Sequence, residues 1–105
     1  MSEAEPRVSE MPRLYNVFDM PKLMSVRTTT MLRSKVDLKE ILKRVQRTRK
    51  IRRSNKEVVK FEVRRGAYLL LFPSLYIEVH AFDEGSVREV LLAFRDELFK
   101  SGLIR

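Results

Sequence analysis

The chain has 105 residues, a length that suits one domain with a single core. Hydrophobic residues make up 44% of it, which argues against global disorder. Cysteine is absent, so disulfides, thiolate metal sites and thiol nucleophiles are excluded, and no apolar run approaches the roughly 18 residues of a membrane span.

The composition also suggests where the protein works. The first ten residues, MSEAEPRVSE, have no basic n-region and no apolar h-region, so we expect no signal peptide. The lack of Cys fits a reducing compartment, which predicts a cytoplasmic location. The chain has only three Asn or Gln residues, whereas 34% of its residues are charged. This composition resembles that of thermophile proteins.

The net charge of +8 is concentrated in one part of the chain. Residues 21–56 carry +11, whereas residues 1–20 carry −2 and residues 57–105 carry −1. A localised excess of this kind is what an anion-binding surface requires.

Residues 1–22 contain three prolines and no sustained periodicity, so we predict a mobile N-terminal tail before a single domain at 23–105. The tail includes an apolar patch around Leu14, Val17 and Phe18. This patch either covers an edge of the domain or docks on a partner as a short motif, and we favour the first interpretation.

Residues 23–32 alternate and are rich in Thr and Val, which predicts a strand. A helix should follow from Asp37, with Glu40 completing a capping box, and should end near Thr48. Its apolar stripe consists of Leu38, Ile41, Leu42 and Val45.

The second half of the chain predicts three further strands and a helix. The strands cover residues 57–65, 67–72 and 75–82, with turns at Arg65-Gly66 and Pro73-Ser74. Ser86 and Glu89 form a capping-box pattern at the start of the last helix, and Gly102 ends it.

The predicted fold is therefore α+β, in the order βαβββα, with an antiparallel sheet and two helices on one face. The other sheet face should be open, as a surface for binding or dimerisation. Its expected residues include Ser25, Arg27, Thr29, Lys60, Arg64 and Phe72, together with Glu62, Tyr76, Glu78 and His80.

Residues 43–56 hold eight Lys or Arg and no acid. They could form a solvated helix end and loop, or they could contact phosphates, which we favour. The predicted nucleic-acid-binding residues are Lys43, Arg44, Arg47, Arg49, Lys50, Arg52, Arg53 and Lys56.

The run RTTTMLRSKVDLKEI resembles the first strand and helix of one half-repeat of the TATA-box-binding protein (TBP) family. VVKFEV, AYLLLF, LYIEVHA and the last helix follow in the same order, so the resemblance covers residues 24–101. It implies a TBP-like half-saddle that reads DNA with its open face, where Phe72 matches a wedging Phe. Glu62 and Glu78 depart from that pattern, because the family has neutral residues on this face.

The segment LYIEVHAFDEGSVREVLLAFRDEL has a weaker likeness to the small dimerising subunit of the KEOPS tRNA-modification complex. This second likeness implies a role in dimerisation.

The sequence contains no nucleophile–base pair and no metal-ligand cluster, and its one histidine, His80, suits a sheet surface better than a metal site. We therefore expect no enzyme, cofactor, metal or small-molecule substrate. The predicted function is binding of DNA or RNA, as a module with a role in transcription. The alternative is a protein-interaction subunit, acting as a homodimer or with a heteromeric partner. We expect no membrane association.

Overall fold

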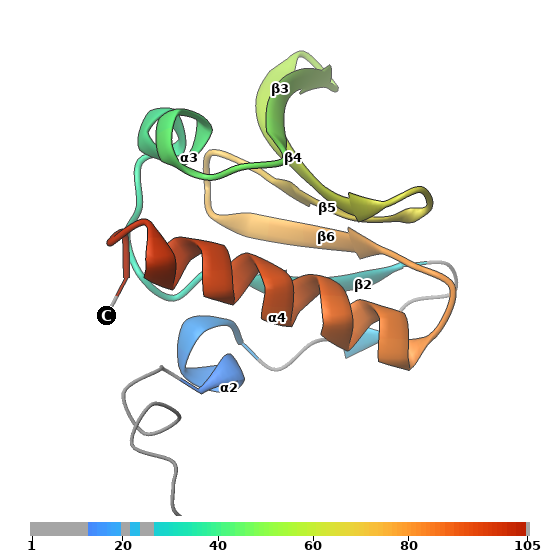
Figure 1. The fold of residues 1–105 in the computed structure, drawn as a ribbon. Helices are drawn as coiled ribbons and strands as arrows, with labels where there is room; N and C mark the ends of the chain where they lie inside the picture. The colour runs from blue at the N-terminus through green and yellow to red at the C-terminus, as the bar shows by residue number, and fades with distance from the viewer. Residues whose placement is uncertain (1–12, 20–21, 24–26, 105) are drawn as a thin grey trace, which may run out of the picture.

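The computed structural model describes residues 13–19, 22–23 and 27–104 (Figure 1). In chain order the elements are α2 (Leu14–Val17), β1 (Lys22–Leu23), β2 (Thr28–Met31), α3 (Leu38–Arg44), β3 (Thr48–Arg53), β4 (Lys56–Arg64), β5 (Ala67–Leu71), β6 (Tyr76–His80) and α4 (Glu84–Lys100).

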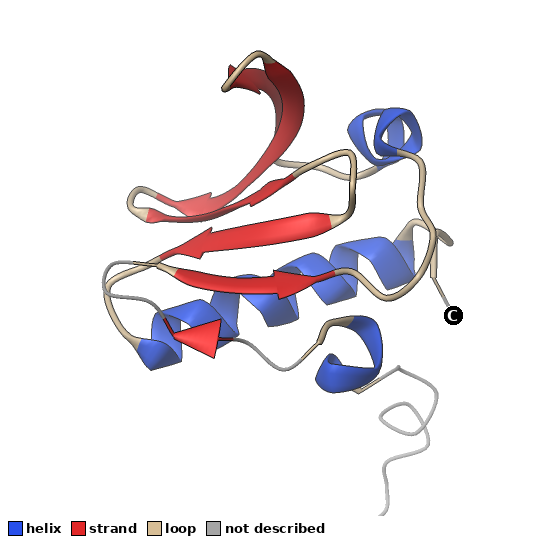
Figure 2. Ribbon diagram, turned by 180° about the vertical axis from the view of Figure 1, so that it is seen from behind, coloured by secondary structure: helices blue, strands red, loops and turns tan. Residues whose placement is uncertain are grey.

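The strands form one six-stranded sheet in the order β1-β2-β6-β5-β4-β3, and every neighbouring pair is antiparallel. Strands β3 to β6 follow one another as a meander, and β6 then pairs with β2. The long helix α4 crosses one face of this sheet (Figures 1 and 2). The predicted α+β fold with an antiparallel sheet is confirmed, although β1 and β3 were not expected.

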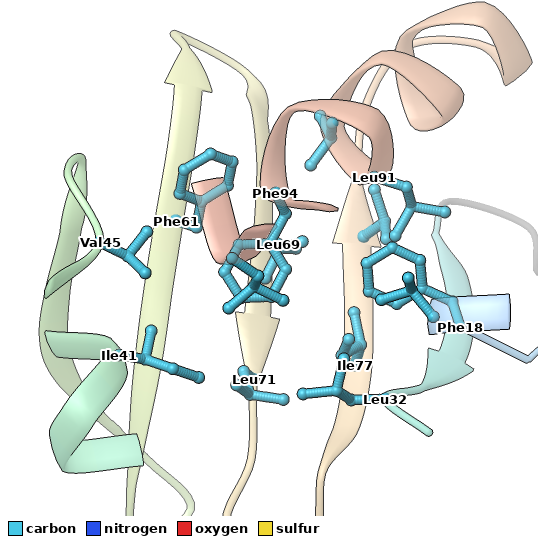
Figure 3. Close-up of a cluster of buried hydrophobic side chains, with 14 of the residues drawn as sticks. Phe18, Leu32, Ile41, Val45, Phe61, Leu69, Leu71, Ile77, Leu91 and Phe94 are labelled. Carbon is cyan, nitrogen blue, oxygen red and sulfur yellow. The ribbon is translucent and has the colours of Figure 1, made fainter. Parts of the chain in front are cut away.

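The core lies between the sheet and the helices (Figure 3). Phe94 of α4 is fully buried and its ring centroid lies 5.0 Å from that of Phe61 on β4. Ile41 of α3 and Val45, the residue after its last turn, belong to the same buried cluster, so both helices cover the same sheet face. Each fully buried large apolar side chain contributes roughly 1.5–3 kcal/mol through removal of its surface from water.

Helix α3 begins as predicted but ends earlier. The Asp37 carboxylate accepts a hydrogen bond from the backbone N–H of Lys39 at 3.0 Å. The helix stops at Arg44, because Val45 takes an extended conformation and Arg47 has a φ of 66°. The predicted end near Thr48 is therefore wrong, since residues from Thr48 onward pair with β4 instead.

Helix α4 starts before the predicted residue. Asp83, not Ser86, is its N-cap, and the Asp83 carboxylate accepts a hydrogen bond from the Ser86 backbone N–H at 2.8 Å. This bond holds the pKa of Asp83 below its usual value, because it stabilises the charged form. At the other end, Gly102 has a φ of 80°, and bonds from Gly102 to Phe99 and from Leu103 to Leu98 form a Schellman motif.

The predicted tail boundary at residue 22 is too late. Residues Leu14–Val17 form α2, and Leu14, Val17 and Phe18 are buried in the main core. The Phe18 and Phe94 rings stack with their centroids 6.3 Å apart. The apolar patch thus covers the domain, as favoured from sequence, while residues 1–12 lie outside the described residues.

The predicted strand at residues 23–32 is shorter than expected. Strand β2 covers Thr28–Met31, and Lys22–Leu23 forms the separate strand β1. The two strands pair antiparallel, with Leu23 opposite Thr28. Residues 24–26, including the predicted face residue Ser25, lie outside the described residues.

Candidate nucleic-acid interface

The basic segment forms a strand at the edge of the sheet. Strand β3 pairs with β4 over its whole length, from Thr48 opposite Phe61 to Arg53 opposite Lys56. Its other side has no strand partner in the described part of the chain. The two-residue turn at Ser54-Asn55, with φ values of 53° and 64°, connects the strands as a tight hairpin.

Pairing with β4 divides the basic side chains between the two sheet faces. Phe61 and Val59 belong to the helix-side core, so their partners Thr48 and Lys50 also lie on that side. Arg49, Ile51 and Arg53 therefore alternate onto the opposite face. We call this opposite face the distal face.

The free edge of β3 exposes backbone groups as well as cations. The Glu62 N–H donates to the Arg47 carbonyl at 3.2 Å, which makes this pair hydrogen-bonded. Hydrogen-bonded pairs alternate along an antiparallel ladder. The N–H and C=O groups of Thr48, Lys50 and Arg52 consequently point to the free edge.

Three of the predicted nucleic-acid-binding residues have carboxylate partners. Arg44 lies 3.1 Å from Glu40, Lys50 lies 3.7 Å from Glu57, and Arg53 lies 3.0 Å from Glu78. The other five form no ion pair with any residue that the structure describes, and all are exposed. We call these five the uncompensated cations: Lys43, Arg47, Arg49, Arg52 and Lys56.

The Arg53–Glu78 pair shows that the sheet is curled. Arg53 is on β3 and Glu78 is on β6, three strand positions away, which corresponds to about 14 Å in a flat sheet. A 3.0 Å contact on the distal face therefore requires the sheet to bend toward that face. Figure 2 shows the β3–β4 end bent away from the plane of the other strands.

The curled sheet partly covers the distal face. Val58 and Leu70 are 0% and 2% exposed, although neither belongs to the main core cluster. Glu78 is also buried, and its carboxylate contacts both Arg53 and, at 3.3 Å, the Nε2 of His80. The sequence suggested that Glu78 would disfavour DNA binding, but in the structure its carboxylate is paired with Arg53 and His80.

Aromatic and basic side chains line the rest of the distal face. The Tyr68 and His80 rings stack with centroids 4.9 Å apart, and the Lys60 Nζ lies 4.3 Å from the Tyr68 centroid. A cation at this distance is attracted by the ring electrons. Phe72 lies on the same face, with its ring 5.6 Å from that of Tyr76.

The structure separates three residues that the sequence predicted on the distal face. Arg64 is wrongly placed by the sequence, because the register with β5 shifts between Glu62 and Arg64 and turns it to the helix side. There its guanidinium binds Glu89 of α4, which raises the pKa of Arg64. Thr29 pairs with Glu78 and so lies on the distal face, as predicted. Arg27, two residues earlier, alternates to the same side, and its Nε is buried without a hydrogen-bond partner.

Strand β3 itself was missed from sequence, because its charge density obscured its pairing pattern. The signal that could have located it is Ser54-Asn55, a turn-forming pair between TRKIRR and KEVVKF.

No group of three or more His, Asp or Glu residues in the described chain could hold a metal ion. None of the described helices is both long and apolar enough to span a bilayer. Neither finding bears on the cation-rich strand.

Comparisons with known proteins do not identify the chain. It matches no protein-family model, no curated protein and no solved structure.

Proposed function

We propose that this protein is a non-enzymatic nucleic-acid-binding module that resembles one TBP lobe, and that β3 and its flanking residues contact the phosphates. The observation that carries this proposal is the set of uncompensated cations on the edge strand β3 and on the residues that flank it. Like charges this dense repel one another, so binding a polyanion would relieve the repulsion. A cytoplasmic site and a role in transcription are parts of the same proposal.

The curled sheet supports the proposal further. A sheet that bends toward its distal face presents a concave surface, and Arg49, Lys60 and the aromatic rings lie on that side. Phosphate contacts position a protein on nucleic acid, whereas base contacts specify sequence. The β3 cations suit the first role, so we expect weak sequence preference.

The test is fluorescence anisotropy with labelled duplex DNA, duplex RNA and single-stranded DNA over a range of salt concentrations. On duplex DNA each neutralised phosphate contributes a log–log slope of about −0.9. Replacing Arg47, Arg49 and Arg52 by Ala should therefore make the slope less steep by about 2.7. The matched control replaces Lys35, Arg65 and Arg88, which are exposed cations outside β3.

Both variants lose the same formal charge, so they separate a local interface from general attraction. Equal losses of affinity in the two variants would contradict the proposed site. Binding by the wild type that does not respond to salt would contradict phosphate contact altogether.

The alternative function, a protein-interaction or dimerisation module, has one specific observation in its favour. Met31 is 41% exposed, pairs with Tyr76 and lies on the distal face, so it extends the aromatic pair formed by Tyr76 and Phe72. Light scattering over a concentration series tests this surface. A dimer that Met31→Lys dissociates would favour the alternative, and a monomer at every concentration would count against a homodimer.

A further inference from the structure

A groove lies on the helix side of the β3–β4 hairpin, between this hairpin and α3. Its volume is about 430 Å³, within the range typical of ligand-binding sites. It also borders Lys56 and Val58, whose side chains alternate to the distal side of β4. Its lining includes Asp37, Leu38, Lys39 and Leu42 at α3, and Lys56 and Glu57 on β4.

The apolar part of the groove comes from a second row on α3. Ile41 and Val45 are buried in the core, whereas Leu38 and Leu42 are half-buried and line the groove. Residues four apart lie on the same side of a helix, so these two leucines form a continuous apolar strip. Helix α4 packs on β4, β5 and β6, and α3 on β3 and β4, which leaves this strip at the end of the helical layer.

Some charged groups around the groove already have a partner within the protein, and others do not. The Asp37 carboxylate already accepts the Lys39 backbone N–H, and the Glu57 carboxylate lies 3.7 Å from the Lys50 ammonium. Lys39 and Lys56 are exposed, and neither forms an ion pair with another described residue. Two ammonium groups are therefore available above an apolar floor.

We propose that this groove binds a partner protein through an amphipathic acidic segment. Two apolar side chains one helical turn apart would pack on Leu38 and Leu42, and flanking carboxylates would pair with Lys39 and Lys56. An apolar centre with a charged, solvated rim is the usual anatomy of a protein-docking site, and helices bind such grooves through anchors at this spacing. The apolar floor disfavours a nucleic-acid backbone here, because phosphates and sugars supply no apolar anchors.

The groove shares Lys56 with the proposed nucleic-acid interface, so the test residue is Lys39, which is on α3 and outside the basic segment. The probe is a short fluorescein-labelled peptide with two Leu residues four apart and flanking Glu residues. Two-dimensional ¹H–¹⁵N NMR of the full chain should show peptide-dependent shifts at residues 38–42, 56–59 and 73. A matched peptide with Ser in place of Leu should bind at least about tenfold more weakly, since it lacks the apolar surface that both leucines would bury.

Charge reversal then tests the rim. Lys39→Glu should weaken binding of the Glu peptide and strengthen binding of a Lys peptide, and it should not harm folding, because an acid in the first turn of a helix is favourable. The control is Lys35→Glu, an exposed change outside the groove. DNA affinity should be the same for both variants, which distinguishes failure here from failure of the nucleic-acid proposal.

The inference is overturned if the wild type shows no shifts with the Glu peptide, or if the shifts map to Tyr68, Phe72 and Tyr76 on the distal face. It is equally overturned if Lys39→Glu and Lys35→Glu bind both peptides alike.

Discussion

The ion pair between Arg53 and Glu78 should hold the curl of the sheet, and a double-mutant cycle can measure its contribution. The changes are Arg53→Ala, Glu78→Ala and the two together. The Glu78 side chain is 9% exposed and that of Arg53 is 38% exposed. Breaking a fully buried pair costs about 3–5 kcal/mol, and exposed pairs couple by about 0.2–1 kcal/mol. The half-exposed arginine places the expected coupling between these limits, at about 1–2 kcal/mol.

The two single changes should also differ. Arg53→Ala leaves a buried carboxylate with His80 as its remaining contact, whereas Glu78→Ala leaves a guanidinium that can reach water. Arg53→Ala should therefore lower the free energy of unfolding more, by about 2–3 kcal/mol, because an unpaired charge in a buried site is costly. Urea denaturation monitored by circular dichroism measures both values.

Lys50 and Glu57 form the matched control pair. They link β3 to the adjacent strand β4. Their charged groups are 3.7 Å apart and both side chains are 58% exposed, so their coupling should be below about 0.5 kcal/mol. Raising salt to about 1 M should abolish this small coupling and should leave most of the coupling between Arg53 and Glu78. Equal couplings for the two pairs would refute the conclusion that Arg53 and Glu78 hold the curl.

Three further predictions concern the scaffold. Phe94→Ala should lower the free energy of unfolding by about 3–5 kcal/mol in urea titrations, because it removes a fully buried ring. Its control is Phe82→Ala, at a site 83% exposed, which should change the free energy of unfolding by less than about 0.5 kcal/mol. Gly66→Ala should cost about 1–2 kcal/mol in the same assay, because φ at this residue is +82°. Asp83→Ala should lower the thermal midpoint near neutral pH, because the helix loses its N-cap bond to Ser86.

The Asp83 prediction has a defined pH dependence. Its folded pKa lies below the ordinary value of 3.8, so the stabilisation is fully present above that value and is lost as pH falls through the folded pKa. The difference in thermal midpoint between wild type and Asp83→Ala should therefore be constant near neutral pH and should disappear in strong acid. A difference that persists unchanged there would contradict a carboxylate cap.

Gly66 and Phe82 are in contact, so combining their substitutions provides a control for Gly66→Ala. A Cβ at Gly66 would lie 3.0 Å from Cζ of Phe82. Because that ring is exposed and able to move, Gly66→Ala should cost nearly the same in a Phe82→Ala background. A large rescue would show that the ring contact, rather than the backbone conformation, accounts for the cost.

Local patterns in the sequence were sufficient to predict much of the scaffold. Asp37 caps α3 and Gly102 ends α4, because each depends on a few neighbouring residues. Alternation also placed Lys60 and Glu78 opposite the helix-covered face, since side chains in a strand alternate with a period of two. The basic segment was recognised as a charge cluster, although three of its eight cations, Arg44, Lys50 and Arg53, have carboxylate partners in the folded chain.

Tertiary structure decided how those cations are arranged. Whether residues 48–53 form a strand depends on pairing with β4, and the bulge that turns Arg64 to Glu89 depends on register with β5. Which lysines and arginines are compensated depends on contacts between residues far apart in the chain, as for Arg53 and Glu78. Charge content is a property of the sequence alone, whereas uncompensated charge on a curled edge is a property of the folded sheet.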